Sequence, residues 1–192
     1  MDGTDIASPR ERILAATEKL FYREGINATG VDRIAEEARV SKRTLYRHFP
    51  SKNDLVEQYL RRIHDTNGVR NEQALDTPTA TARGQLLAIF DSSPVDRFRG
   101  CPFHNAAVEA ADDMPRVHDV VHEHKLGFIK RLTDKAAEAG ANDPYRLGHQ
   151  LGVLFEGALA LATSLNDTAA MIHARSAAEI LIDAAVRPPS PA

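Results

Sequence analysis

The segment spanning residues 31–50 constrains the fold more than any other part of the chain. It reads VDRIAEEARVSKRTLYRHFP, with apolar residues at helical spacing on both sides of a short polar break. Ser41 is a typical N-cap residue, and Leu45 and Phe49 follow it four residues apart, on one side of a helix. We therefore expect two short helices joined by a tight turn, with Leu45 and Phe49 as the apolar anchors of the second.

The outward side of this second helix is basic. Between Arg39 and Lys52 the chain has five Lys or Arg residues and no Asp or Glu, although its formal net charge is −3. Residues 1–62 contain 12 Lys or Arg and 10 Asp or Glu, whereas residues 63–192 contain 12 and 17. Positive charge gathered on one short helix is typical of a surface that meets a nucleic-acid groove. The alternative is a solvated basic helix without a partner.

Particular side chains in and around the basic helix suit DNA. Arg43 and Arg47 lie four residues apart, so both face one side, and arginine is the usual bidentate reader of guanine. Thr44 and Tyr46 carry hydroxyls for phosphate oxygens. Lys52 opens the next helix, where its charge and the free backbone amides favour a phosphate. The predicted DNA contacts are Thr29, Lys42, Arg43, Thr44, Tyr46, Arg47, His48 and Lys52.

Helix signals recur along the whole chain, and strand signals are nearly absent. The expected helix starts include a capping box at residues 8–11, Thr29, Thr77-Pro78 and Asp143-Pro144. We expect an all-α fold of about nine helices, with a three-helix helix-turn-helix head and a C-terminal helical bundle. The predicted division is a DNA-binding domain at 1–50, a connecting helix at about 51–66, a ligand-binding and dimerisation domain at 67–187, and a disordered tail at 188–192.

Residues 151–165 form the most apolar stretch of the chain, interrupted by Glu156. A helix that is apolar almost all round must be covered on most sides, either by a partner subunit or as the central helix of a monomer. The residues alone leave both interpretations open. Glu156 is expected at a wet edge, and the alternative is a buried partner for an arginine or a polar group in a pocket.

Three features favour a cytoplasmic protein. The chain has one cysteine, so it has no internal disulfide framework, as expected in a reducing compartment. Its start, Met-Asp-Gly-Thr-Asp, is acidic and lacks the apolar core of a signal peptide. The longest apolar run, residues 151–165, is too short to cross a bilayer. We therefore expect a soluble, cytoplasmic protein without a membrane partner.

Cys101 is a candidate sensor residue. It follows an expected loop at residues 91–100 that contains two arginines. Pro102 suits the first position of a helix, so the thiol would lie at a helix N-terminus, where the thiolate is favoured. The alternative is a buried thiol that behaves as a small apolar side chain. The candidates for lining a ligand pocket are Cys101, Phe103, Phe128 and Phe155.

His118 and His122 stand four residues apart on one helix face, with His124 beside them. This spacing can hold zinc, but two ligands do not make a site, and we favour a solvated polar face without metal or cofactor. A small thiol enzyme using Cys101 with His104 or His118 is a further alternative. We do not expect an enzyme, because the chain has no Gly-rich phosphate loop, nucleophile elbow or cysteine-hydrolase signature.

The head resembles that of a known family. The pattern G-x3-T-x-V-D-x-I-A-x2-A-x-V-S-K-x-T-L-Y-x-H-F-x-S-K, from Gly25 to Lys52, is similar to the DNA-binding head of TetR-type (TetR/AcrR) transcriptional regulators. The resemblance covers residues 8–62. The family usually has glycine between the two short helices where this chain has Arg39. A left-handed arginine there costs about 1 kcal/mol relative to glycine.

The resemblance implies partners and a mode of action. TetR-type proteins are usually homodimers in which the last two helices of each subunit form a four-helix bundle with those of the other. They bind palindromic double-stranded DNA operators, most often as repressors, and a small-molecule effector in the C-terminal domain changes the spacing of the two heads. The segment Arg-Gly-Cys-Pro-Phe around Cys101 is similar to one in a subgroup of these regulators. A redox-, electrophile- or metal-responsive regulator on the same scaffold is the alternative.

Overall fold

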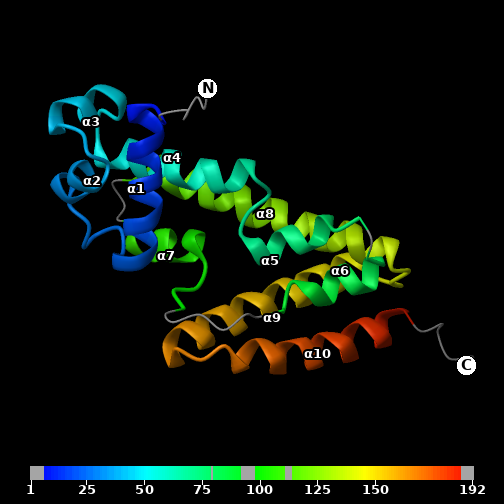
Figure 1. Cartoon of the computed structure of the whole chain (residues 1–192). Helices are drawn as coiled ribbons and strands as arrows, with labels where there is room; N and C mark the ends of the chain where they lie inside the picture. Colours follow the sequence, from blue (N-terminus) through cyan, green and yellow to red (C-terminus); the bar gives the residue numbers. More distant parts are fainter. Residues whose placement is uncertain (1–6, 79, 92–97, 111–113, 187–192) are drawn as a thin grey trace, which may run out of the picture. The chain divides into compact units, whose positions relative to one another are not determined.

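The computed structural model describes residues 7–78, 80–91, 98–110 and 114–186, and every element of regular structure in these ranges is helical (Figure 1). The predicted all-α fold is confirmed. The elements, in chain order, are α1 (Pro9–Glu24), α2 (Val31–Glu37), α3 (Lys42–His48), α4 (Lys52–Asp65), α5 (Arg70–Gln73), a 3-10 helix (Ala74–Asp76), α6 (Ala82–Ala88), α7 (Pro102–Glu109), α8 (Pro115–Glu138), α9 (Pro144–Leu165) and α10 (Ala169–Val186).

The chain divides into two compact units. The first unit comprises Met1–Asp65 and Pro102–Val121, and the second comprises Thr66–Cys101 and His122–Ala192. The first unit therefore holds α1 to α4 together with α7 and the start of α8. A segment from the middle of the chain belongs to the same unit as the predicted DNA-binding head.

Local sequence explains the helices of the first unit. α1 begins at Pro9 because Ser8 is its N-cap, with Ser8 Oγ accepting a hydrogen bond from Glu11 N at 3.2 Å. The helix ends at Gly25, whose φ of 96° lies where only glycine is unstrained. Buried apolar side chains from α1 to α4 form the core of this unit, among them Ile13, Leu20, Phe21, Ile34, Leu45, Leu55 and Leu60.

The predicted start of α2 at Thr29 is wrong by one residue. Thr29 is fully buried, and its hydroxyl donates a hydrogen bond to Gly25 O at 2.6 Å. The hydroxyl oxygen is therefore turned back toward α1 and does not cap the next helix. Gly30 occupies the N-cap position of α2 instead, without a side-chain hydrogen bond.

The predicted helix start at Thr77-Pro78 is also wrong. Thr77 follows the 3-10 helix, and its carbonyl accepts a hydrogen bond from Gln85 Nε2 at 2.7 Å. The next helix, α6, is capped by Thr81, whose Oγ1 accepts from Gly84 N at 3.1 Å. The sequence offers two threonine caps four residues apart, and the buried amide of Gln85 holds the first of them outside the helix.

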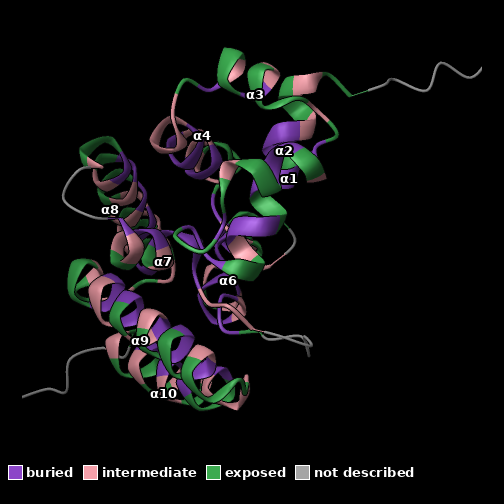
Figure 2. Ribbon diagram, turned by 90° about the vertical axis from the view of Figure 1, so that its left-hand side faces the viewer, coloured by how far each residue is buried: buried purple, intermediate pink, exposed green. Residues whose placement is uncertain are grey.

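In the second unit, α9 and α10 lie side by side (Figure 1). α9 begins at Pro144 as predicted, with the side chain of Asp143 as its cap, and its C-cap residue, Asn166, is in a left-handed conformation. The start of α9 is joined to the end of α10 by Asn142, whose N and Nδ2 both donate to Ala185 O at 2.9 Å. Buried residues alternate with exposed ones along α9 (Figure 2), so one side of this helix remains open in the single chain.

Parts of two predicted features lie outside the described residues. The loop predicted at residues 91–100 is described only at residue 91 and from residue 98 onward, and the tail predicted at 188–192 is not described. Within the described ranges, no helix is long and apolar enough to cross a membrane.

Candidate nucleic-acid interface and effector site

α3 has two apolar anchors on one side and a polar, basic surface on the other. Leu45 and Phe49 are each 1% exposed, which confirms them as anchors. Arg43 and Arg47 are exposed, and neither forms an ion pair with a described residue. Their guanidinium groups are therefore available for base edges. The remaining predicted contacts on this helix are the exposed Lys42 and Tyr46 and the half-buried Thr44 and His48.

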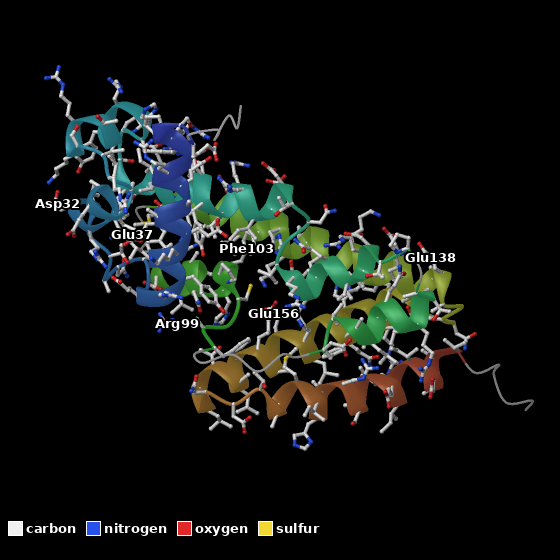
Figure 3. The ribbon with its side chains drawn as sticks, in the orientation of Figure 1. Asp32, Glu37, Arg99, Phe103, Glu138 and Glu156 are labelled. Carbon is white, nitrogen blue, oxygen red and sulfur yellow. The ribbon has the colours of Figure 1, made fainter. Side chains whose placement is uncertain are left out.

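Three of the predicted contacts have a local environment that the sequence did not indicate. Lys42 Nζ lies 2.8 Å from Asp32 Oδ1, and the hydrogen bond and charge of Asp32 raise the pKa of Lys42. Asp32 projects from the first turn of α2 (Figure 3). Thr44 Oγ1 lies 2.9 Å from Ser41 Oγ. His48 Nε2 is buried and has no hydrogen-bond partner among the described residues.

The turn between α2 and α3 is closed by Arg39 in a left-handed conformation, with φ of 53°, as expected where the family usually has glycine. Arg39 N donates to Glu36 O and Val40 N donates to Ala35 O, both at 3.0 Å. These bonds satisfy the last carbonyls of α2. The tight turn of the sequence-based prediction is therefore present with arginine in place of glycine.

Lys52 occupies the first position of α4. Burial lowers the pKa of Lys52, and the charge of Glu109 opposes that effect. Glu109 lies at the end of α7, where its Oε2 accepts a hydrogen bond from Asn27 N at 2.8 Å and its carbonyl accepts one from Asn27 Nδ2 at 3.0 Å. The turn between α1 and α2 is thus joined to α7 within the first unit.

Thr29 is the one predicted contact that the structure places in the interior. Its side chain is fully buried, and its hydroxyl is already a donor to Gly25 O. This position argues against a direct contact with DNA. The hydroxyl instead holds the turn between α1 and α2, and the isolated sequence carried no sign of that bond.

Cys101 lies beside a charged pair in the second unit. The residue is 2% exposed, and Lys125 Nζ donates a hydrogen bond to its Sγ at 3.3 Å. The same Nζ lies 2.5 Å from Glu156 Oε1. Burial alone would lower the pKa of Lys125, but the nearby Cys101 and Glu156 outweigh it and raise the pKa. Glu156, predicted at a wet edge, is half-buried and paired with a lysine.

The predicted pocket residues are core residues in the single chain. Phe128 and Phe155 are buried in the second unit, with ring centroids 5.3 Å apart. Phe90, which the sequence did not single out, lies 5.9 Å from Phe155. Phe103 is equally buried but belongs to the first unit. Of the three predicted pocket phenylalanines, Phe128 and Phe155 therefore lie together, and Phe103 belongs to the other unit.

The histidines of α8 do not form a cluster. His118 is half-buried and His122 is exposed, whereas His124 is buried and its Nε2 lies 3.0 Å from Glu72 Oε2. Among the described residues, no group of three or more His, Cys, Asp or Glu side chains could hold a metal ion. The buried pair of Glu72 and His124 was missed because Glu72 lies in a polar segment without clear periodicity.

Comparisons with known proteins cover both parts of the chain. A family model described as "Bacterial regulatory proteins, tetR family" matches residues 13–59, and one described as "Tetracyclin repressor-like, C-terminal domain" matches residues 84–178. The chain is 36% identical over 143 residues to the transcriptional repressor KstR2 of Mycolicibacterium smegmatis, a match that covers 73% of this chain and 69% of that protein. The chain belongs to the TetR family.

Further relatives agree with this membership. The chain is 34% identical over 139 residues to the probable transcriptional regulator ArpR of Pseudomonas putida, covering 68% of this chain and 65% of ArpR. The matches thus span about two thirds of the length of these curated relatives. A solved TetR-family regulator from Streptomyces coelicolor is 34% identical, with a TM-score of 0.79 over 93% of this chain and 96% of its own. The class of function predicted from the head, DNA-binding transcriptional regulation, is that of the family.

Proposed function

We propose that this TetR-family protein is a transcriptional repressor that binds a palindromic operator through α3. The observation that carries the proposal is the acid-free outward side of α3, fixed in place by the buried Leu45 and Phe49. The proposed contacts are the predicted set without Thr29: Lys42, Arg43, Thr44, Tyr46, Arg47, His48 and Lys52. In this proposal residues 1–50 bind DNA, 51–66 connect, and 67–187 bind the effector and the partner subunit.

A homodimer through α9 and α10 accounts for the open side of these helices. Val153 and Ile180 are 76% and 71% exposed, although both are large apolar residues. An exposed apolar surface of this kind is typical of a protein interface. Further exposed apolar side chains on the same two helices are Leu161, Leu165 and Ile172. A dimer would place two α3 helices on successive major grooves, about 34–36 Å apart.

A small-molecule effector would act by binding more tightly to the dimer conformation in which the spacing of the two heads does not match the operator. Support comes from the C-terminal family model, which covers residues 84–178. The aromatic cluster of Phe90, Phe128 and Phe155 is the apolar candidate for the effector site. We place the protein in the cytoplasm, with the operator DNA, and infer that it acts as a regulator without enzymatic activity.

A second candidate is control by electrophiles at Cys101, favoured by the contact between Lys125 Nζ and Cys101 Sγ. A lysine ammonium beside the sulfur favours the thiolate, which is the nucleophile. The sulfur would add to the β-carbon of an unsaturated carbonyl compound, and a proton would go to the α-carbon. The test is DNA release by N-ethylmaleimide, expected for the wild type and absent in Cys101→Ser. Equal release in both proteins would contradict this mode of control.

Selection of bound DNA from a random pool tests the main proposal. The full-length protein should enrich a palindrome with half-sites one helical turn, about 10 base pairs, or a multiple of it apart. A parallel selection with Arg43→Ala and Arg47→Ala in one chain should lose that palindrome. Enrichment of no sequence by the wild-type protein would contradict the proposed function.

A further inference from the structure

Arg116 lies in the first turn of α8, in the first unit, and binds two carboxylates of α4. Its Nη2 donates to Asp54 Oδ1, and its Nη1 lies 3.3 Å from Glu57 Oε2. Glu57 is largely buried and also accepts a bond from Arg61 Nε at 3.0 Å. Isolated surface ion pairs contribute little, but here one planar guanidinium spans two carboxylates, one of which is held by a second arginine. The position of the Arg116 guanidinium is therefore restricted by Asp54 and by Glu57, which Arg61 also holds.

Asp54 connects Arg116 to the start of α4. Ser51 Oγ donates to Asp54 Oδ2 at 2.6 Å, and Asp54 N donates to Ser51 Oγ at 3.1 Å. The hydrogen bond from Ser51, followed by the one from Arg116, lowers the pKa of Asp54, so the carboxylate stays charged at neutral pH. This reciprocal cap closes the first turn of α4. Arg116 therefore contacts the turn from which α4 begins.

That turn also sets the position of Lys52 relative to α3. Lys52 follows the cap residue Ser51 directly, and Phe49, the C-cap residue of α3, lies three residues before Lys52. Phe49 is anchored in the core, and Lys52 is half-buried. Arg116, which binds the cap through Asp54, would therefore order the proposed phosphate contact of Lys52 relative to α3.

We propose that Arg116 is a positioning residue for operator binding, acting through Asp54 and the α4 cap to order Lys52 against a DNA phosphate. This inference rests on the proposed function. Arg116 lies within residues 84–178, matched by the C-terminal family model, and outside residues 13–59, matched by the head model. The proposed effector-binding part of the chain would thus supply a side chain on which the proposed DNA contact depends.

The experiment compares operator binding by full-length wild type, Arg116→Ala and Arg61→Ala over a salt series, using the palindrome selected from the random pool. Arg61→Ala is the matched control, because it removes the same charge from Glu57 without touching Asp54. Arg116→Ala should weaken operator binding on the order of fivefold, the lower end of typical coupling between sites. Its log–log salt slope should become shallower by about 0.9, the loss of one phosphate contact.

A second comparison separates positioning from mere loss of charge or fold. In a Lys52→Ala background, Arg116→Ala should not change the salt slope further, because the contact that Arg116 orders is already gone. Arg116→Lys, which can pair with one carboxylate at a time, should give an intermediate affinity. Thermal unfolding of each variant reports the fold independently of the slope.

Several outcomes would overturn the inference. One is an operator affinity and salt slope in Arg116→Ala equal to those of the wild type. Another is a loss of affinity in Arg116→Ala no larger than that in Arg61→Ala. The third is a salt slope in the Lys52→Ala Arg116→Ala double variant that is shallower than in Lys52→Ala alone. Failure of the wild-type protein to bind any selected DNA would instead overturn the proposed function and, with it, this inference. The two failures are therefore distinguishable.

Discussion

Arg39 carries local strain in the turn between α2 and α3, because its φ of 53° is a conformation that side chains with a Cβ adopt at a cost. Arg39→Gly should raise the free energy of unfolding by about 1 kcal/mol, as the left-handed penalty is removed. Urea unfolding followed by circular dichroism measures the change. Ala15→Gly, at an exposed position inside α1, is the control and should lower stability by about 1 kcal/mol. A destabilised Arg39→Gly would show that the turn is not strained.

Gly68 is required by a close approach in the second unit. Its φ is 85°, and a Cβ there would lie 1.7 Å from Glu72 Oε2 and 3.0 Å from His124 Cε1. Gly68→Ala should lower the free energy of unfolding by about 2 kcal/mol or more, because the buried carboxylate must leave its histidine. The control is Gly127→Ala, where nothing lies within 4 Å of the added Cβ, and a gain of up to about 1 kcal/mol is expected. Equal thermal midpoints for the two variants would contradict this account.

Single residues show where sequence-based prediction succeeds. Leu45, Phe49 and the cap Ser41 were predictable because the helix period and the N-cap preference act within a few residues. The roles of Thr29 and Lys125 were not. The hydroxyl of Thr29 donates to Gly25 O across an irregular turn, whose path the helix period does not describe. Lys125 contacts Cys101 and Glu156, which are distant in the sequence, and local rules contain no information about such partners.

At the scale of elements, α3 and the start of α4 should contribute differently to DNA binding. Arg43→Ala or Arg47→Ala should weaken binding by about 1–3 kcal/mol and relax the preference for particular base pairs, as expected for a bidentate reader of guanine. Lys52→Ala should weaken binding to all sequences alike and make the salt slope shallower. Competition assays with single-base operator variants distinguish the two. If the arginine variants lost the same affinity for every operator sequence, Arg43 and Arg47 would contact phosphates and not base edges.

The cap of α4 predicts a pH dependence of stability. The pKa of Asp54 is lowered by Ser51 and then by Arg116, so it lies below the unfolded value. A depressed carboxylate pKa stabilises the fold above the unfolded pKa of about 3.9, and that contribution disappears as the pH falls through the folded pKa. Asp54→Asn should therefore be less stable than the wild type at pH 7, with the difference shrinking in acid. Urea midpoints from pH 7 to pH 2.5 measure this, and a constant difference would contradict it.

Most elements were predictable from the sequence, and the two that were missed, α5 and the 3-10 helix, have a common cause. α1 and α9 begin at caps and prolines that the sequence displays, and α4 begins after the cap residue Ser51. α5 and the 3-10 helix lie in a polar segment without periodicity and depend on α8, where Arg131 Nη2 donates to Glu72 O at 2.8 Å and lies 2.9 Å from Asp76 Oδ2. Such short elements are stabilised from outside, so their own residues do not indicate them.

At the scale of the whole molecule, the proposed dimer depends on α9 and α10. Val153→Asp combined with Ile180→Asp should convert the dimer to a monomer, because each charge would be buried without a partner in the interface. Sedimentation at micromolar concentration measures the mass, and operator affinity should fall with it. Leu126→Asp, at an exposed apolar residue of α8, is the matched control and should leave the mass unchanged. A dimer that survives the paired change would place the interface elsewhere.

The membership of Pro102–Val121 in the first unit limits how this regulator can be taken apart. A chimera that joined residues 1–65 to the body of another family member would leave Asn27 without its carboxylate from Glu109 and Asp54 without its guanidinium from Arg116. The head would keep its three helices and lose these contacts from α7 and α8. The head and body of this chain are therefore not freely interchangeable parts, and an engineered sensor built on it must carry α7 and the first turns of α8 along with the helix-turn-helix.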